Sequence, residues 1–137
     1  MGYSYLFNCR NCKHSQQLYE GWRFMDHDRT VESILNSSQI KLHYKTRQKI
    51  TMLSKAHLQL QVKTEYKIYR CRCCLQLYDK LVVSVWSGDQ LLHETRFKCA
   101  SCGRHLKHTN IHRLKFAACP KCRSRQFEKS KALMLWN

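Results

Sequence analysis

The chain of 137 residues has few of the residues on which many catalytic sites depend, with only four glycines and one proline. Phosphate-binding loops and nucleophile elbows need glycines at fixed spacing, and no such motif is present. One compact carboxylate–histidine group occurs, Asp26-His27-Asp28. It stands just before a helical pattern, where helix capping explains it better than catalysis. We therefore expect no enzymatic activity.

Long apolar runs are also missing. No stretch approaches the length needed to cross a membrane. The first residues, Met1 to Leu6, contain neither a basic leader nor an apolar segment of the kind found in secretory signals. We expect an intracellular, cytoplasmic protein with no membrane partner.

Acidic residues are scarce. Nine Asp and Glu stand against 25 Lys and Arg, which gives a formal net charge of +16. If eight cysteines bind two zinc ions as thiolates, the ions and thiolates together add about −4 and leave about +12. Such an excess favours a polyanionic partner, usually nucleic acid. The alternative is a surface that is basic only for solubility.

Cysteine, by contrast, is abundant, with nine residues. In the C-terminal part, Cys99 and Cys102 form one C-x2-C pair, and after sixteen residues Cys119 and Cys122 form another. Two short turns that each aim two sulfurs at one point suit the tetrahedral preference of zinc. A disulfide framework is the alternative, but the odd cysteine count and the lack of a secretory signal count against it.

The N-terminal half repeats the arrangement of strand, cysteine pair and strand. Residues 2–8 alternate in polarity, lead into Cys9 and Cys12, and are followed by a β-compatible stretch at 15–24. A second alternating stretch, 58–68, leads into Cys71 and Cys74, with a β-rich run at 75–86. We therefore predict two zinc ions per chain, each held by two C-x2-C pairs that follow one another in the sequence. The ligands of the first ion are Cys9, Cys12, Cys71 and Cys74. The ligands of the second ion are Cys99, Cys102, Cys119 and Cys122.

Other ligand sets stay open. Cys71 and Cys74 could pair with Cys99 and Cys102, which would leave the outermost pairs to meet each other. An interleaved cross-brace, as in RING-type domains, is a further alternative. Cys73 is the spare thiol in our prediction, although ligation through it in place of Cys71 or Cys74 is also open.

These patterns predict a small, zinc-stabilised α+β fold built from two zinc ribbons. The first ribbon occupies 1–88, with hairpins at 2–24 and 58–86, and it carries a helical insertion at 25–57. Within the insertion we expect a short helix around Val31, Ile34 and Leu35 and a second helix over 39–56. The second ribbon, 89–137, is strongly basic, and we expect the segments 95–98 and 111–118 to lead into its two cysteine turns.

Basic residues are the candidates for contact with nucleic acid. Four come from the predicted second helix and six from the C-terminal ribbon, which we expect to lead binding: Lys41, Lys45, Arg47, Lys49, Arg104, Lys107, Arg113, Lys115, Arg123 and Arg125. The interleaved aromatics could stack on unpaired bases, but core packing is favoured for Phe97 and Phe116. The histidines in 105–112 are expected at the surface rather than in a third metal site.

The order of these motifs resembles that of small bacterial tandem zinc-ribbon proteins, which mostly lack an assigned function. The resemblance rests on the aromatic first strand, the segment 20–24, the helical insertion and the four cysteine pairs. It departs from the usual pattern because proline and glycine are missing around the first two cysteine pairs and because Cys73 is extra. Ribbons of this type resemble modules of transcription, translation and nucleic-acid processing, which implies a nucleoprotein context.

Two functions follow from the sequence. The first is a non-catalytic accessory protein that binds nucleic acid, with RNA or single strands favoured. The second is a protein-interaction adaptor or inhibitor that docks on a larger nucleoprotein machine. The sequence indicates no oligomeric state.

Overall fold

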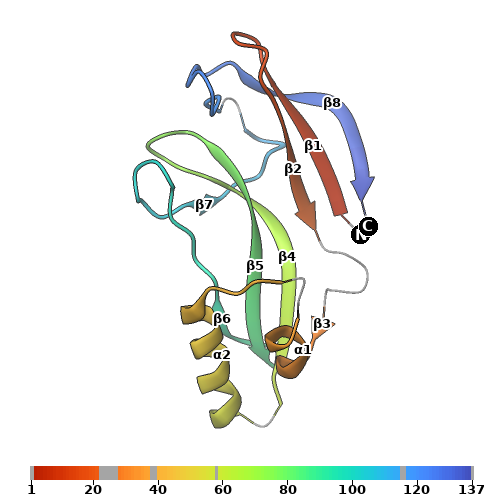
Figure 1. Cartoon of the computed structure of the whole chain (residues 1–137). Coiled ribbons are helices and arrows are strands. Elements are labelled where there is room, and N and C mark those ends of the chain that lie inside the picture. Colours follow the sequence, from red (N-terminus) through yellow and green to blue (C-terminus); the bar gives the residue numbers. More distant parts are fainter. Residues whose placement is uncertain (1, 22–27, 38–39, 58, 115–116, 137) are drawn as a thin grey trace.

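A computed structural model describes residues 2–21, 28–37, 40–57, 59–114 and 117–136 (Figure 1). The strands are β1 (Gly2–Cys9), β2 (Ser15–Gly21), β3 (Asp28–Arg29), β4 (Gln61–Arg70), β5 (Leu77–Ser87), β6 (Gln90–Glu94), β7 (Lys107–His108) and β8 (Phe127–Trp136). The helices are α1 (Val31–Leu35) and α2 (Tyr44–Ala56). None of the described helices is long and apolar enough to span a membrane.

All strand pairs are antiparallel, and the main order is β6-β5-β4-β2-β1-β8, with β3 and β7 also paired to β4. β4 and β5 form the longest ladder, from Gln61↔Trp86 to Arg70↔Leu77. β2 meets β4 at a single register pair, Gly21↔Tyr66. The sheet therefore has two ends, β1–β2–β8 and β4–β5–β6, that share little backbone pairing.

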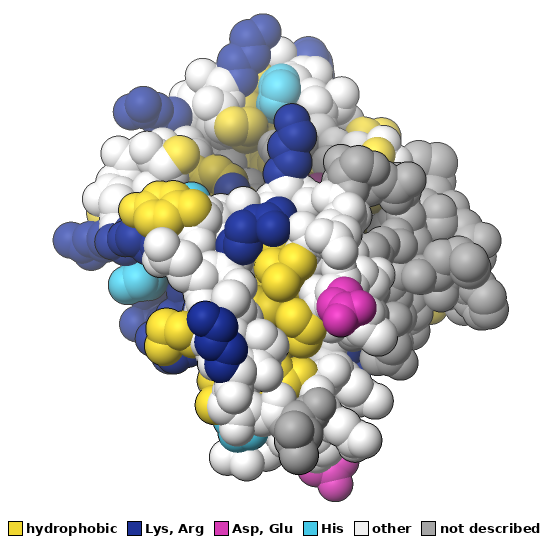
Figure 2. Space-filling view, turned by 60° about the horizontal axis from the view of Figure 1, so that its bottom comes forward, with side chains coloured by type: hydrophobic (Ala, Val, Ile, Leu, Met, Phe, Trp, Pro, Cys, Tyr) yellow, Lys and Arg dark blue, Asp and Glu magenta, His cyan; other side chains and the backbone are white. Residues whose placement is uncertain are grey.

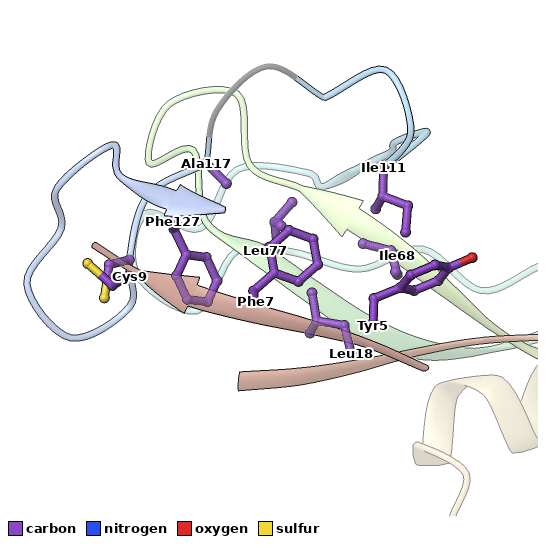
Figure 3. Close-up of a cluster of buried hydrophobic side chains, with 10 residues drawn as sticks. Tyr5, Phe7, Cys9, Leu18, Ile68, Leu77, Ile111, Ala117 and Phe127 are labelled. Carbon is purple, nitrogen blue, oxygen red and sulfur yellow. The ribbon is translucent and has the colours of Figure 1, made fainter. Parts of the chain in front are cut away.

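The apolar residues form separate cores, of which the one beside β1, β2 and β8 also takes Ile68 from β4 and Leu77 from β5. Phe7 of β1 and Phe127 of β8 stack with their ring centroids 5.4 Å apart, and Leu18 and Ile68 pack with them (Figure 3). At the other end, α1 and α2 cover β4 and β5 and enclose Ile34, Ile50, Val62 and Val85 (Figure 1). Apolar and polar residues alternate over 58–68, so one face of this strand is apolar and must be buried. The two helices bury it.

The predicted elements are largely present, with shifted boundaries. Thr30 caps α1, and its side chain accepts a hydrogen bond from the backbone N–H of Ser33. The second helix begins at Tyr44 rather than at residue 39, because His43 adopts an extended conformation and caps it. Asp26 and His27 lie outside the described residues, and Asp28 belongs to β3.

The segment 111–118, expected as a β-compatible lead into the Cys119 turn, forms no strand at its described residues 111–114 and 117–118, and 115–116 lie outside the described residues. Asn110 Oδ1 accepts a hydrogen bond from the backbone N–H of His112, and this side-chain bond favours a turn over a strand. Among the described residues of that segment, Ala117 alone forms a bridge, to Phe127. The strand that completes this end of the sheet is β8, which pairs along β1. β1 and β8 belong to different predicted ribbons, and the division at residue 88 stays a prediction.

Candidate metal centres

The eight cysteines of the C-x2-C pairs lie in two groups of four, and within each group all sulfur atoms are within 4.8 Å of one another. The first sulfur cluster contains Cys9, Cys12, Cys119 and Cys122, and the second contains Cys71, Cys74, Cys99 and Cys102. In Figure 1 the β1–β2 turn lies beside the loop before β8, and the β4–β5 turn lies beside the loop before β7. Each cluster could hold one metal ion.

The predicted grouping of the cysteines is therefore wrong, and the outer-with-outer alternative is the one observed. Sequential grouping requires the 9–12 turn to meet the 71–74 turn. Instead, β8 pairs along β1 and brings Cys119 and Cys122 to the turn that follows β1. The inner pairs then meet because β7 pairs with the end of β4 just before Cys71.

All four cysteine turns share one backbone geometry. In each, the first cysteine's N–H donates to the carbonyl five residues on, and its carbonyl accepts from the N–H four residues on, at 2.7–3.1 Å. The residue four positions after that cysteine has a positive φ: Lys13 (64°), Leu75 (61°), Gly103 (75°) and Arg123 (62°). A left-handed residue there turns the chain back, so that both sulfurs of a pair point to one side.

The positive φ gives a test of these turns. A Cβ placed on Gly103 would meet nothing within 4 Å, so Gly103→Ala should add backbone strain alone. We expect the free energy of unfolding to fall by about 1 kcal/mol, with both metal ions retained. Denaturant unfolding and native mass spectrometry would measure the two quantities. Loss of a metal ion would show that the turn tolerates no side chain at this position.

The sulfur separations suit a tetrahedral ion. Cys9 and Cys122 are 3.5 Å apart, Cys12 and Cys119 3.5 Å, and Cys71 and Cys102 3.4 Å, each measured between Sγ atoms. Four sulfurs at about 2.3 Å from a zinc ion would lie about 3.8 Å from one another. Four thiolates complete the tetrahedron and leave no position for a water molecule, which is typical of structural rather than catalytic sites.

Hydroxyl and amide groups that can donate to a thiolate surround the sulfurs, and the protonated Cys122 thiol itself donates to the Ser124 hydroxyl. In the first cluster, the Ser124 hydroxyl lies 3.2 Å from Cys122 Sγ and 3.4 Å from Cys9 Sγ, and Asn11 Nδ2 donates to Cys122 Sγ at 3.6 Å. In the second cluster, the Tyr78 hydroxyl lies 3.4 Å from Cys99 Sγ. Such donors orient thiolates and disperse their charge.

These donors were missed by the sequence analysis. Ser124 and Asn11 lie within their cysteine turns, so an inspection of turn residues could have found them. Tyr78 lies on β5 and carries no local signal.

The metal-free thiols differ in acidity. Hydrogen bonds from Ser124 lower the pKa of Cys122 to about 5. Burial raises the pKa of Cys99, but hydrogen bonds from Tyr78 and from backbone amides outweigh it and bring the value to about 6. The hydrogen bond with Cys102, followed by burial, raises the pKa of Cys74 to about 12. Each cluster thus presents at least one thiolate to a cation at neutral pH.

Metal affinity should rise with pH. Cys74 carries a proton at neutral pH without metal, and a bound cation must displace it. Each displaced proton changes the apparent affinity about tenfold per pH unit below the pKa of its thiol. Competition with a chromophoric chelator between about pH 6 and 8 would measure this slope. An affinity independent of pH would contradict the assignment of Cys74 as a thiolate ligand.

Cys73 is exposed and belongs to neither cluster. Cys73→Ser should therefore keep both metal ions and nearly the full stability, whereas Cys74→Ser should lose one ion. Native mass spectrometry of the two variants gives a matched comparison. Release of an ion by Cys73→Ser would show that Cys73 is a metal ligand, contrary to the assignment of Cys74.

The predicted nucleic-acid contacts lie on several parts of the surface. Lys49 is half-buried, Lys115 lies outside the described residues, and the other eight are exposed: Lys41, Lys45, Arg47, Arg104, Lys107, Arg113, Arg123 and Arg125. The Arg47 guanidinium donates to the Leu35 carbonyl at 2.9 Å and so ties α2 to α1. Phe97 is half-buried, and Phe116 is outside the described residues. The histidines at 105, 108 and 112 are exposed.

No protein-family model matches the chain, and comparison with curated proteins and with solved structures found no match. The two four-cysteine clusters are compatible with tandem zinc ribbons.

Proposed function

We propose that this protein is a zinc-binding, non-catalytic accessory protein that binds nucleic acid, with RNA or single strands favoured over duplex DNA. The observation that carries the proposal is the strong positive charge, because two bound zinc ions would leave about +12 of the formal +16. On the face in Figure 2, Lys and Arg side chains are widespread and acidic side chains are few.

Zinc is the proposed ion at both clusters. Four sulfur donors select a soft or borderline-soft metal, and separations of 3.4–3.9 Å between neighbouring sulfurs suit its tetrahedron. The role we assign to it is structural. Both clusters lie against apolar cores, since Cys9 and Cys119 are buried beside Phe7, and Cys71 and Cys99 beside Tyr69.

Nucleic-acid binding is tested with the zinc-loaded chain. A fluorescein-labelled 12-nucleotide oligouridylate is titrated at several salt concentrations and followed by anisotropy. Affinity should fall steeply with salt, with a log–log slope of about −0.7 for each phosphate contacted. Absence of binding at low salt by a protein that holds both zinc ions would refute the proposal.

An adaptor that binds another protein is the second candidate. Tyr44 and Met52, both on α2, are 61% and 62% exposed. Tyr and Met are enriched at protein–protein interfaces relative to the rest of the protein surface. A partner recovered from nuclease-treated lysate, lost on Met52→Lys, together with no binding to the oligouridylate, would favour this function.

A further inference from the structure

A groove with a cavity volume of about 610 Å³ lies between the N-terminal end of α2 and residues 93–98. The two sides are some fifty residues apart in the sequence, one in the helical insertion and one in the basic C-terminal part. The volume falls in the range of sites that hold small organic ligands. Neither side forms the groove alone, so the sequence pattern gave no sign of it.

The floor of the groove is apolar and belongs to the core under α2. Ile40 and Val83 are buried in that core, and Leu81 packs against it. Thr95 fixes the opposite side to β5, because its N–H donates to the Val83 carbonyl and its hydroxyl accepts from the Val83 N–H, both at 3.1 Å. The floor is therefore preformed.

Phe97 supplies an aromatic ring to the lining. Its ring packs edge-on against Tyr69, with centroids 5.4 Å apart and planes at 65°, and Lys80 Nζ lies 5.9 Å from its centroid. These contacts hold the ring in place while the side chain remains half-buried. A held, partly exposed ring can stack on a planar ligand at little entropic cost.

Cations surround this floor. Lys41 and Lys45 come from one side and Arg96 and Lys98 from the other, and all four are exposed. Among the described residues that line the groove there is no Asp or Glu. The pKa of His93 is lowered by burial and then by Lys49 and Arg96, against a smaller opposing effect of Glu94, in keeping with a positive local potential.

We propose that this groove receives an unpaired nucleotide of a single-stranded nucleic acid. The base lies against Phe97 and the aliphatic floor, and the flanking phosphates contact Lys41, Lys45, Arg96 and Lys98. A duplex hides the faces of its bases, so among nucleic acids an aromatic, apolar floor surrounded by cations suits a single strand rather than a duplex. The assignment rests on the proposed function and locates its site.

The experiment uses the full zinc-loaded chain, the labelled oligouridylate and an RNA hairpin duplex of equal charge. Phe97→Leu keeps an apolar side chain and removes the ring, and Phe97→Tyr is its matched control. We expect Phe97→Leu to weaken oligouridylate binding about tenfold with an unchanged salt slope. Phe97→Tyr should bind like the wild type, and the duplex should be insensitive to both variants.

Charge is tested separately. Lys41→Glu with Lys45→Glu should flatten the log–log salt slope by about 1.4, the value for two phosphate contacts. The matched pair Lys55→Glu with Lys129→Glu makes the same charge change on exposed residues that neither line the groove nor belong to the predicted nucleic-acid contacts, and it should flatten the slope much less. Zinc content and melting temperature, measured for every variant, show that the fold is intact.

The outcomes separate the two proposals. If the wild type binds the oligouridylate but the groove variants equal their matched controls, the groove assignment is overturned and the proposed function stands. If the zinc-loaded wild type binds no oligouridylate at low salt, both fall. An oligoglutamate that binds as tightly and weakens as much on Phe97→Leu would reassign the groove to acidic peptides.

Discussion

Replacing Cys12 and Cys122 together with serine should remove one metal ion and leave the other in place. Both sulfurs belong to the first cluster, so the second substitution destroys a site that the first has already broken. Replacing Cys12 and Cys74 together should remove both ions, because these residues lie in different clusters. Both double variants contain Cys12→Ser and differ only in the second cysteine that is replaced, so each is the control of the other.

Native mass spectrometry of the zinc-loaded variants gives the stoichiometry directly. The observed grouping predicts one ion for the first variant and none for the second. Sequential grouping along the chain predicts the reverse result. The experiment therefore decides the connectivity without any assumption about folding energies, and one ion in both variants would contradict either grouping.

Much of the local structure could be predicted from the sequence because its causes are local. Alternation at residues 2–8 and 58–68 predicted β1 and β4, and the C-x2-C spacing predicted the four cysteine turns. Spacing within a turn determines which way its two sulfurs point. It carries no information about which other turn lies opposite.

The partner of each turn is decided by strand pairing across long distances. Cys12 and Cys119 are 107 residues apart, and they meet because β8 pairs with β1. β8 alternates weakly, so its residue pattern offers little reason to place it against β1. The groove beside Phe97 escaped prediction for the same reason, since its two sides are joined only by tertiary packing.

Removing the metal with a strong chelator should unfold the β1–β2–β8 end of the sheet first. Apparent binding energies of structural zinc, about 10–16 kcal/mol, equal or exceed the net stability of a domain this small. The first sulfur cluster joins segments near both ends of the described chain. Without its ion, the chain entropy released by opening so large a loop favours separation of β1 from β8.

We expect the part of the other end that lies under α1 and α2 to depend less on metal, although the second sulfur cluster packs against Tyr69 of β4 and Val82 of β5. The core formed by Ile34, Ile50, Val62 and Val85 contains no cysteine among its described residues, and the β4–β5 ladder beside it is continuous. We expect amide hydrogen exchange in β1 and β8 to become fast on chelation, while amides of β4 and β5 near Val62 and Val85 keep partial protection. Added zinc should restore protection in β1 and β8. Equal loss of protection at both ends would show that the two cores form one cooperative unit, and unchanged protection throughout would show that the clusters do not stabilise the fold.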